Sequence, residues 1–396
     1  FLYFWRMEKF RFIDLFAGIG GFHVAMESFG GQCVFASDID PDCRMMYAQN
    51  FGIEPAGDIT KVNVEDIPAH DVLCAGFPCQ SFSKAGNRLG VNDPRGTLFF
   101  DIVRIAEHHK PKYMLLENVR NLAGHDGGNT WKTIHHYLTK LGYSVSSEPI
   151  IFSPHYIGIP QHRERVFILC VRKGQGALPE LSFDKTKKPT CNAFDILEDD
   201  ARITDLQRYK LSQTEVEVID IWNDFIKNIK GGLPGFPVWS EWLRDVNGVD
   251  NIGQYPKWKQ DIIVKNSELY KQNKTFINKW LTRAQRNTAF TGAKAKFEWQ
   301  AGKTDTPNLW DNLMHFRPSG LRVKAPTHYP ALVAITQTSI VGPRRRRLTP
   351  RECAALQSFP KELALHPNPR IAYRQLGNSV NVEVVKRFAG LLFNNS

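Results

Sequence analysis

The most constraining feature of this sequence is an alternation of short apolar runs with amphipathic stretches between residues 10 and 172. The apolar runs that have the composition of strands lie at 10–16, 71–78, 113–119 and 165–172. The stretches between them, such as GTLFFDIVRIAEHHKPK at 96–112, carry apolar residues at helical spacing. Strands that alternate with helices in this way indicate an α/β fold with a doubly wound, mostly parallel sheet.

The pattern changes after residue 172. Residues 173–345 contain Gly and Pro turns, short apolar runs and scattered tryptophans, and we expect those tryptophans to form the core of a small domain. Residues 380–393 again have helical periodicity, so we expect the tail to rejoin the α/β body. The sequence therefore predicts one domain from 7–172 and 375–396, and a smaller, irregular domain from 173–374 that includes the insert 173–345.

The positive charge of the chain is concentrated in that middle segment. The 396 residues carry 51 Lys and Arg against 40 Asp and Glu, a formal net charge of +11. Residues 172–347 hold 29 of the basic and 19 of the acidic side chains, so almost all of the excess lies there. A local basic excess is typical of proteins that bind a polyanion such as nucleic acid. A solubilising surface would have the same composition, and composition alone leaves both interpretations open.

Cysteine usage and hydropathy exclude several classes of protein. The seven cysteines are odd in number and form no CxxC pair, which disfavours a disulfide framework and a zinc site. We therefore expect a reducing, cytoplasmic setting and no metal. No run approaches the roughly 20 apolar residues of a membrane helix, so we expect no membrane association. Six residues precede Met7, and we expect Met7 to be the natural first residue.

The segment DLFAGIGG at 14–21 joins the first strand to a helix through glycines at 18, 20 and 21. A glycine turn of this kind lets the backbone approach a ligand at the helix N-terminus. Asp38 ends the next strand, 20 residues after Gly18, where an acid can bind both hydroxyls of a ribose. The spacing differs from GxGxxG, which argues against a dinucleotide. A tight turn followed by a surface acid is the alternative interpretation.

Two further motifs place reactive side chains at strand ends. In GFPCQSFS at 76–83, Cys79 follows a strand and should lie at the carboxyl edge of the sheet, where doubly wound folds bind ligands. In LLENV, Glu117 and Asn118 end another strand at the same edge. A lone cysteine is usually a small buried hydrophobe, and an acid at a strand end is often a surface residue. Each motif therefore also has a purely structural interpretation.

Flexible and basic segments lie next to these strand ends. The segment 80–98, which follows Cys79, is rich in glycine and polar residues, as is typical of a lid. In GIPQHRERVF, Arg163 and Arg165 alternate just before the last strand and so share one side. Guanidinium groups at such a position suit phosphates, carboxylates or carbonyls, and a solvated strand start is the alternative.

Taken together, these segments resemble the cytosine-5 DNA methyltransferase family, of the prokaryotic restriction–modification type. The motifs follow the family's order: DLFAGIGG, GFPCQ, ENV, QHRER, RRLTPRECAALQSFP at 346–360 and QLGNSV at 375–380. GDIT at 57–60 and DPRGTLFFDI at 93–102 match as well. Six motifs in the right order and spacing are highly specific, and the matches cover the chain from about residue 10 to about residue 390 except for the basic insert.

The resemblance implies a Rossmann-like fold that binds S-adenosylmethionine and a cytosine at the carboxyl edge of one sheet. The cofactor-binding residues that it implies are Phe16, Gly18, Gly20, Asp38, Ile39, Asp58, Ile59, Pro78, Asn378 and Ser379. Asp38 would bind the ribose hydroxyls, and Ile39 would pack on the adenine. Asn378 and Ser379 would close the pocket from the far end of the chain. The domain made of 7–172 and 375–396 would then be the catalytic, cofactor-binding domain.

The same resemblance implies four catalytic residues and no metal. Cys79 would add as a thiolate to C6 of cytosine, which makes C5 nucleophilic. Glu117 would hold or protonate N3 and the exocyclic amine, a role that a raised pKa favours. Arg165 would reach O2 of the base and brace Glu117, and Arg163 would order the pocket. C5 would then take the sulfonium methyl group and lose its proton, and Cys79 would be eliminated.

A cytosine inside a duplex is out of reach of these groups, so the base must flip out, and the 80–98 loop would close over it. The DNA-binding residues that we expect are Ser83, Arg95, Arg344, Arg345 and Arg346. The insert is the target-recognition region in this family, so 173–374 would be that domain. We expect a monomer that acts on duplex DNA and protects host DNA, with any cognate restriction endonuclease acting separately.

Three other interpretations explain these residues less well. The related tRNA-modifying branch has PPCQ-like motifs and a shorter insert, whereas here Phe77 precedes Pro78 and Cys79. A catalytically silent relative would not need Cys79, Glu117 and Arg165 together. A nicotinamide-dependent oxidoreductase is compatible with the glycine turn, but it explains neither Cys79 nor Glu117.

Overall fold

The computed structural model describes residues 9–78, 98–180, 189–246, 252–333 and 338–394. The chain divides into two compact units. Unit 1 comprises Phe1–Cys191, Pro330–Thr336 and Pro350–Ser396, and unit 2 comprises Asn192–Tyr329 and Gln337–Thr349. Within the described ranges, no helix is both long enough and apolar enough to cross a bilayer.

Unit 1 is built on a seven-stranded sheet of order β2-β1-β3-β4-β8-β5, in which β6 also pairs with β8. The strands are β1 (Phe10–Leu15), β2 (Gly31–Ser37), β3 (Val72–Gly76), β4 (Tyr113–Val119), β5 (Tyr143–Val145), β6 (Ile150–Phe152) and β8 (Arg165–Arg172). The pairs β1–β2, β1–β3 and β3–β4 are parallel. The predicted α/β class is therefore confirmed, and the carboxyl ends of these four strands lie at one edge.

The last strand of the sheet runs in the opposite direction. Strand β8 pairs antiparallel with β4, β5 and β6, so the sheet is mixed. A parallel partner would need a crossover of a dozen or more residues, usually a helix. Between β6 and β8 the chain has only a 3₁₀ turn (Pro154–Ile157) and the two-residue strand β7 (Gln161–His162), so it reverses instead. As a result, the start of β8 lies beside the end of β4.

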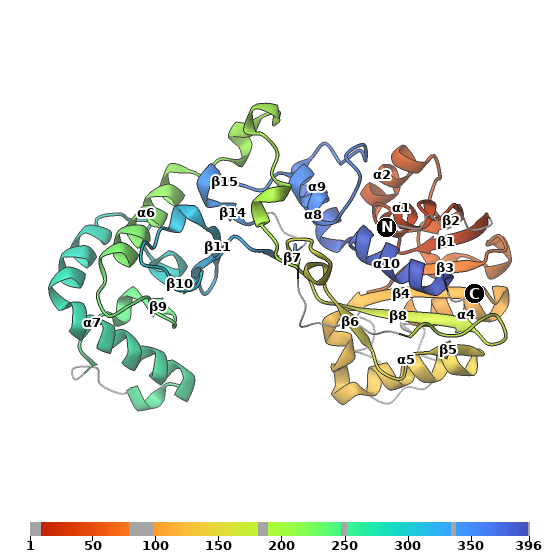
Figure 1. Ribbon diagram of the computed structural model, residues 1–396, viewed down its shortest axis with the longest axis horizontal. Helices are drawn as coiled ribbons and strands as arrows, with labels where there is room; N and C mark the ends of the chain where they lie inside the picture. Colours follow the sequence, from red (N-terminus) through yellow and green to blue (C-terminus); the bar gives the residue numbers. More distant parts are fainter. Residues whose placement is uncertain (1–8, 79–97, 181–188, 247–251, 334–337, 395–396) are drawn as a thin grey trace. The chain divides into compact units, whose positions relative to one another are not determined.

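Helices cover both faces of this sheet (Figure 1). They are α1 (Gly21–Glu27), α2 (Pro41–Phe51), α4 (Leu98–His109), α5 (Asn129–Lys140), α8 (Pro350–Leu356), α9 (Pro369–Asn378) and α10 (Val382–Phe393). On one face, Ile13, Leu73 and Met114 of the strands pack with Phe99 of α4 and Ile134 of α5. On the other, α10 packs against α1, β4 and β8, as Figure 1 shows. The periodic tail therefore does rejoin the α/β body.

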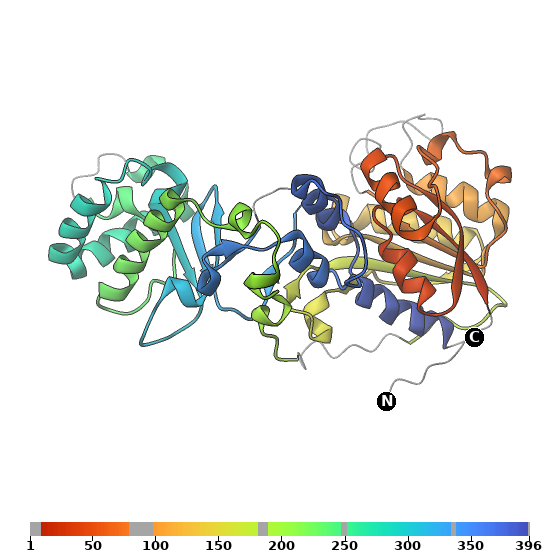
Figure 2. The ribbon, with the colours of Figure 1, turned by 90° about the horizontal axis from the view of Figure 1, so that it is seen from above.

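Unit 2 contains a second sheet, of six strands in the order β15-β14-β11-β12-β10-β9. Its strands are β9 (Val238–Trp239), β10 (Lys296–Gln300), β11 (Leu313–Arg317), β12 (Gly320–Lys324), β14 (Ile340–Val341) and β15 (Arg346–Arg347). Helices α6 (Gln213–Asn228) and α7 (Lys257–Ala284) gather on one side of it (Figure 2). These strands are two to five residues long and separated by turns, which leaves little periodicity in the sequence and fits the smaller, irregular domain that we expected.

Aromatic side chains form the core of unit 2. The tryptophans of this segment that are buried are Trp222, Trp242, Trp280, Trp299 and Trp310. Trp222 stacks on Phe297 with ring centroids 5.0 Å apart. Trp239 is partly buried, and Trp258 is exposed. The prediction that the tryptophans pack in a core is confirmed for the five buried ones.

The bounds of the two units differ from those of the expected domains. Residues 173–191, 330–336 and 350–374 belong to unit 1, whereas we expected them in the smaller domain. Side-chain contacts explain why 350–374 belongs to unit 1. Arg374 of α9 forms ion pairs with Asp40 and Asp42 at the start of α2, at 3.0 and 2.8 Å. These pairs attach the segment before residue 375 to the α/β body.

A cluster of titratable groups is buried beneath β1. Asp14 is fully buried, and its Oδ2 accepts a 3.4 Å hydrogen bond from the Tyr47 hydroxyl. The same hydroxyl lies 2.7 Å from Nδ1 of His23, whose Nε2 contacts Glu27 at 3.1 Å. Burial raises the pKa of the Asp14 carboxyl well above its usual value, and the nearby Asp38 carboxylate raises it further.

This raised pKa should make stability depend on pH. The folded state holds the Asp14 proton more tightly than the unfolded state, so the stabilisation is complete at low pH and is lost as pH rises through the raised pKa. The free energy of unfolding of wild type should therefore fall as pH rises. We expect Asp14→Asn to remove the part of this fall that comes from ionisation of Asp14. Urea unfolding of both proteins between about pH 5 and about pH 8 measures it. Parallel curves for wild type and variant would contradict the prediction.

Candidate active site at the carboxyl edge of the sheet

A cavity of about 670 Å³ lies at the carboxyl edge of the unit 1 sheet. Its walls come from the β1–α1 turn, the ends of β2, β3 and β4, the start of β8 and the end of α9. The predicted site residues that line it are Phe16, Gly18, Asp38, Ile39, Asp58, Ile59, Pro78, Glu117, Arg163, Arg165 and Asn378. The structure thus gathers segments from both ends of the chain around one space.

The turn between β1 and α1 depends on two glycines with left-handed backbone. Gly18 has φ of 57° and Gly20 has φ of 86°, a region that glycine occupies without a steric penalty. A Cβ on Gly20 would lie 2.2 Å from Cε2 of Phe51, whereas a Cβ on Gly18 would meet no atom within 4 Å. Gly18 lines the cavity, and Gly20 is not among its lining residues. The glycine at position 20 therefore allows the Phe51 ring to pack against the turn, whereas the space beside Gly18 is not filled by other protein atoms.

Asp38 is fixed at the end of β2 by backbone donors. Its Oδ2 accepts from the Gly18 amide at 2.8 Å, and its Oδ1 accepts from the Asp40 amide at 2.8 Å. Burial raises the pKa of this carboxyl, and the two amide hydrogen bonds oppose the rise. Ile39 follows with 73% of its side chain exposed, which is unusual for an isoleucine. An acceptor next to an exposed apolar side chain suits a ligand with hydroxyl groups and a flat apolar ring.

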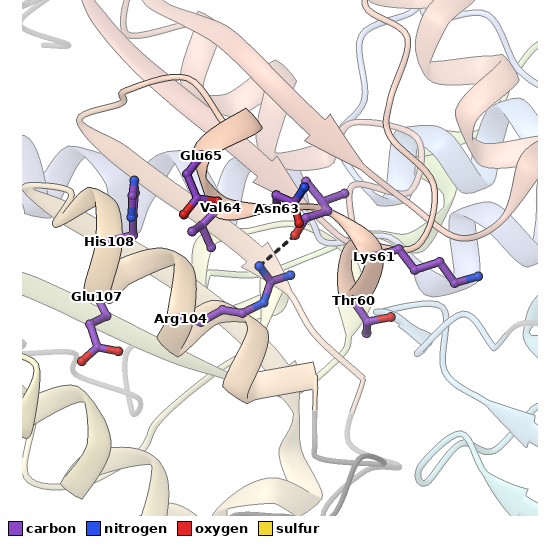
Figure 3. Close-up of a pocket in the computed structure, with 9 residues that line it drawn as sticks. Thr60, Lys61, Asn63, Val64, Glu65, Arg104, Glu107 and His108 are labelled. Carbon is purple, nitrogen blue, oxygen red and sulfur yellow. Dashed lines mark hydrogen bonds between the residues drawn. The ribbon is translucent and has the colours of Figure 1, made fainter.

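Asp58 and Ile59 line the cavity from the segment that follows Ala56, whose carbonyl accepts from the Asp38 amide, and Arg104 holds this segment in place. Its Nη1 donates to the Val62 carbonyl at 2.9 Å and its Nη2 to the Ile59 carbonyl at 2.5 Å. Figure 3 shows this guanidinium beside a second, open pocket of about 690 Å³ on the outer side of the segment. Asp58 accepts from Thr60 at the start of the 3₁₀ turn Ile59–Lys61, and these hydrogen bonds lower its pKa. Sequence reasoning missed Arg104, since nothing in its helix distinguishes it from a surface arginine.

Glu117 and Arg165 form a buried pair at the end of β4. Nε of Arg165 lies 3.1 Å from Oε1 of Glu117, and both side chains are largely buried. Burial raises the pKa of Glu117, and the charges of Arg165 and Arg163 oppose the rise. A carboxyl with a raised pKa at the wall of a cavity is a candidate for general acid–base catalysis.

Arg163 is almost completely buried and binds three carbonyl oxygens. Its Nη1 donates to Leu332 at 3.0 Å, and its Nη2 donates to Gly377 at 3.0 Å and to Ser379 at 2.8 Å. Burial lowers the pKa of its guanidinium to about 9. Ser379, which we expected in the cofactor pocket, is buried behind the wall, whereas Asn378 lines the cavity.

The catalytic cysteine that we predicted lies outside the described residues. The same is true of Ser83, Arg95 and most of the 80–98 loop. The described chain reaches Pro78, which lines the cavity. Nδ2 of Asn118 donates to the Phe77 carbonyl at 2.8 Å and so ties the end of β3 to β4.

The predicted DNA-binding arginines 344–346 belong to unit 2, and they differ in environment. Arg346 is fully buried, and its Nε donates to Oδ1 of Asp200 at 2.9 Å. The expectation that Arg346 contacts DNA therefore disagrees with the structure, because its guanidinium is already bound inside unit 2. Arg345 lies over the ring of Trp310 at 4.4 Å, and Arg344 approaches Asp200 at 3.9 Å. Only the exposed Arg344 and Arg345 offer their charges to a partner.

Two further residues that sequence reasoning missed support the cavity wall. Gln375 is buried and lines the cavity. Gln357, which is also buried, donates through Nε2 to the Leu376 carbonyl at 2.8 Å. Both lie within the two C-terminal motifs, so their positions were visible in the sequence, but nothing there assigned them a role. Within the described ranges, no three His, Cys, Asp or Glu side chains are close enough to hold a metal ion.

Comparisons with known proteins agree with this geometry. The family model described as C-5 cytosine-specific DNA methylase matches residues 10–394. The chain is 35% identical to Type II methyltransferase M.AluI of Cellulosimicrobium cellulans, with 96% of this chain and 91% of that protein covered. It is 32% identical to Type II methyltransferase M.HhaI of Haemophilus parahaemolyticus, with 97% and 94% covered.

Solved structures show the same fold at lower identity. The Dnmt2 methyltransferase of S. pombe superimposes with a TM-score of 0.54 at 20% identity, over 97% of this chain and 98% of that one. A putative DNA modification methyltransferase encoded within a prophage of E. coli gives a TM-score of 0.52 at 20% identity, over 97% and 99%. The family model and the relatives at 32–35% identity confirm the predicted resemblance to the family.

The glycine turn allows a matched test of the cavity wall. We expect Gly20→Ala to lower the free energy of unfolding by about 2–3 kcal/mol, because left-handed strain and the clash with Phe51 add. Gly18→Ala should cost only about 1 kcal/mol, since it introduces the strain without a clash. Urea unfolding measures both values. Equal losses would mean that packing against Phe51 does not require the glycine.

Proposed function

The chain belongs to the C-5 cytosine-specific DNA methylase family and is a DNA cytosine-5-methyltransferase, and we propose that it transfers the methyl group of S-adenosylmethionine to C5 of a flipped-out cytosine in a specific duplex sequence. The observation that carries this proposal is the Glu117–Arg165 pair, with its raised carboxyl pKa, in the wall of the cavity that also contains Asp38.

The part of the cavity next to β2 would hold the methyl donor, and its residues fit that group. Both Asp38 oxygens accept backbone hydrogen bonds and still have lone pairs for the two ribose hydroxyls. The exposed Ile39 side chain offers an apolar surface to the adenine, and Ile59 and Asp58 would meet its edge. Phe16 and Gly18 would line the methionine end, with Pro78 and Asn378 nearby. When bound, the donor supplies a methyl group activated on a sulfonium.

The cytosine would lie against Glu117. We assign Cys79 as the nucleophile on the family resemblance: its thiolate adds to C6, and the electron pair of the C5–C6 double bond moves toward N3. Glu117 gives its proton to N3 and so neutralises the charge that forms there. C5, now nucleophilic, accepts the methyl group and then loses its proton. Elimination of Cys79 restores the double bond, and Glu117 recovers its proton from N3.

The two arginines would organise the base-binding part of the site. The 3.1 Å contact between Arg165 and Glu117 orients the carboxyl, and Nη1 of Arg165 donates to the Glu164 carbonyl at 2.9 Å. We propose that Nη2 reaches O2 of the base. Arg163, bound to the carbonyls of Gly377 and Ser379, acts as a positioning residue for the wall. Because burial already raises the pKa of Glu117, the carboxyl can carry the proton that N3 needs.

The biological setting follows from the relatives. Two of them, at 32–35% identity over nearly the whole chain, are named Type II methyltransferases. We therefore extend the proposal to a monomeric enzyme that protects host DNA in a restriction–modification system, with its endonuclease acting separately. Residues 173–374 would recognise the target sequence, and Arg344, Arg345, Arg95 and Ser83 are proposed to contact the DNA.

Covalent trapping tests the reaction. Bisulfite sequencing of DNA from a host that expresses the protein identifies the target cytosine, and a duplex with 5-fluorocytosine at that position is then the probe. Fluorine cannot leave C5 as a cation, so Cys79 cannot be eliminated after methyl transfer. We expect a stable protein–DNA adduct on a denaturing gel with wild type and S-adenosylmethionine. An adduct that persists in Cys79→Ala, or none with wild type, would overturn the mechanism.

The carboxyl at the cavity wall gives a second test. We expect Glu117→Gln to reduce the rate of methyl transfer roughly 10²- to 10⁴-fold, because an amide cannot pass a proton to N3. Binding of S-adenosylmethionine, measured by calorimetry, should stay within a factor of two or so, since Asp38 is untouched. The matched control is Glu164→Gln, whose carboxylate pairs with Arg120 and does not line the cavity. Equal rates for the two variants would remove Glu117 from the mechanism.

A further inference from the structure

The sheet of unit 2 has two chemically different faces. Alternate residues of β10, β12 and β11, such as Phe297, Leu321 and Met314, point into the core beneath α6 and α7. The residues between them point to the other side, which we call the outer face. The titratable residues of the outer face on these three strands are Lys296 and Glu298 on β10, Arg322 and Lys324 on β12, and His315 and Arg317 on β11. Gln300 and the buried Leu313 lie on the same face, opposite Lys324 in the register. Register places Glu298, Arg322 and His315 side by side across the three strands.

The outer face is strongly basic. Its single carboxylate, Glu298, binds Arg322 at 2.7 Å, which leaves three other cations. Arg317 and Lys324 form no ion pair with any residue that the structure describes. Lys296 lies over the ring of Trp239 at 4.6 Å, at the edge of the same sheet. The net charge of these few side chains is therefore about three positive units.

The cations of this face repel one another. Burial together with the charges of Arg322 and Arg317 lowers the pKa of Lys324. Burial, Arg317, Arg347 and Arg322 lower the pKa of His315 to about 4, so its ring is neutral at pH 7. Like charges on neighbouring strands destabilise a sheet unless an anion lies close to them. A surface with this arrangement gains most from a polyanionic partner.

A groove on the opposite side of unit 2 is acidic and does not suit a polyanion. Helix α6 carries Glu217, Asp220 and Asp224 along a groove that it forms with α7. Asp224 pairs with Arg283, and Asp220 accepts from the indole of Trp310. The basic excess of the middle segment is thus not spread evenly over unit 2. On the outer face the unpaired cations lie on neighbouring strands, the α6–α7 groove is acidic, and the exposed lysines of α7, such as Lys274 and Lys279, lie outside that groove.

We propose that the outer face of the unit 2 sheet binds the phosphate backbone of duplex DNA, with Arg317 and Lys324 as its principal contacts. The inference rests on the proposed function and deepens it, because it assigns phosphate contacts to a sheet face in addition to the exposed Arg344 and Arg345. In the same arginine run, Arg346 is bound to Asp200, and Arg347 to Glu215. Phosphate contacts of this kind set affinity and register, not sequence.

A salt titration tests the assignment. Binding of fluorescent duplexes to wild type and to Arg317→Ala/Lys324→Ala is measured by anisotropy over a range of salt concentrations. We expect the slope of log affinity against log salt to fall by about one for each phosphate that the variant no longer binds, for every duplex sequence. The matched control is Lys274→Ala/Lys279→Ala, which removes the same charge from exposed positions on α7, on the other side of the sheet. Its slope and affinity should equal those of wild type.

A gain of affinity separates the proposal from misfolding. Glu298→Gln removes the only carboxylate of the outer face, and we expect it to bind duplex DNA several-fold more tightly, with a steeper salt slope. Unchanged affinity in this variant, or equal losses of affinity in the two double variants, overturns the inference. If wild type still methylates DNA in that case, the proposed function is not affected. A wild type that neither binds nor methylates duplex DNA overturns both. Stronger competition by polyglutamate than by DNA assigns the face to an acidic protein instead.

Discussion

The buried guanidinium of Arg163 is the interaction on which the site depends. It joins the start of β8 to the carbonyls of Leu332, Gly377 and Ser379, which are far away in the sequence. A guanidinium has five N–H donors and is costly to bury unless they are used, and the fall of its pKa to about 9 reflects that cost. Carbonyl oxygens at the end of α9 offset it. Together with the Gln357–Leu376 hydrogen bond, this interaction fixes Gly377 and Asn378 in the cavity wall.

The ion pair of Glu117 with Arg165 depends on the antiparallel direction of β8. In an antiparallel pair, the first residue of one strand lies opposite the last residue of the other, and here Arg165 lies opposite Val119. The arginines that precede β8 therefore reach the edge at which β4 ends. A parallel β8 would begin at the opposite edge, beside Tyr113, which is four residues or about 13 Å along the strand from Glu117. The reversal of the chain after β6 is thus a condition for the ion pair, and alternation of strands and helices alone did not predict it.

Features formed by residues close together in the sequence were predictable, whereas contacts between residues far apart in the sequence were not. The Gly18 turn and Asp38 were predictable because a strand end and a turn are local features, and the structure joins them by one hydrogen bond. The family motifs also predicted that Asn378 would return to the cavity. Arg346 was misjudged because its partner, Asp200, is 146 residues away, and a run of arginines looks the same whether its members are buried or exposed. The role of Arg104 depends on the carbonyls of Ile59 and Val62, which carry no sequence signal.

The location of the positive charge in the middle segment was also only partly predictable from the sequence. A count over 172–347 gives the size of the excess but not its direction in space. The strand GLRVK contains that information, because alternation sends Leu321 and Val323 into the core and Arg322 and Lys324 to the outer face. Neighbouring strands add Arg317 and Lys296 on that side, and only Glu298 opposes them. Repulsion among these cations lowers stability in the free protein, so its presence is best explained by a partner that neutralises it, and a DNA methyltransferase has such a partner in its substrate.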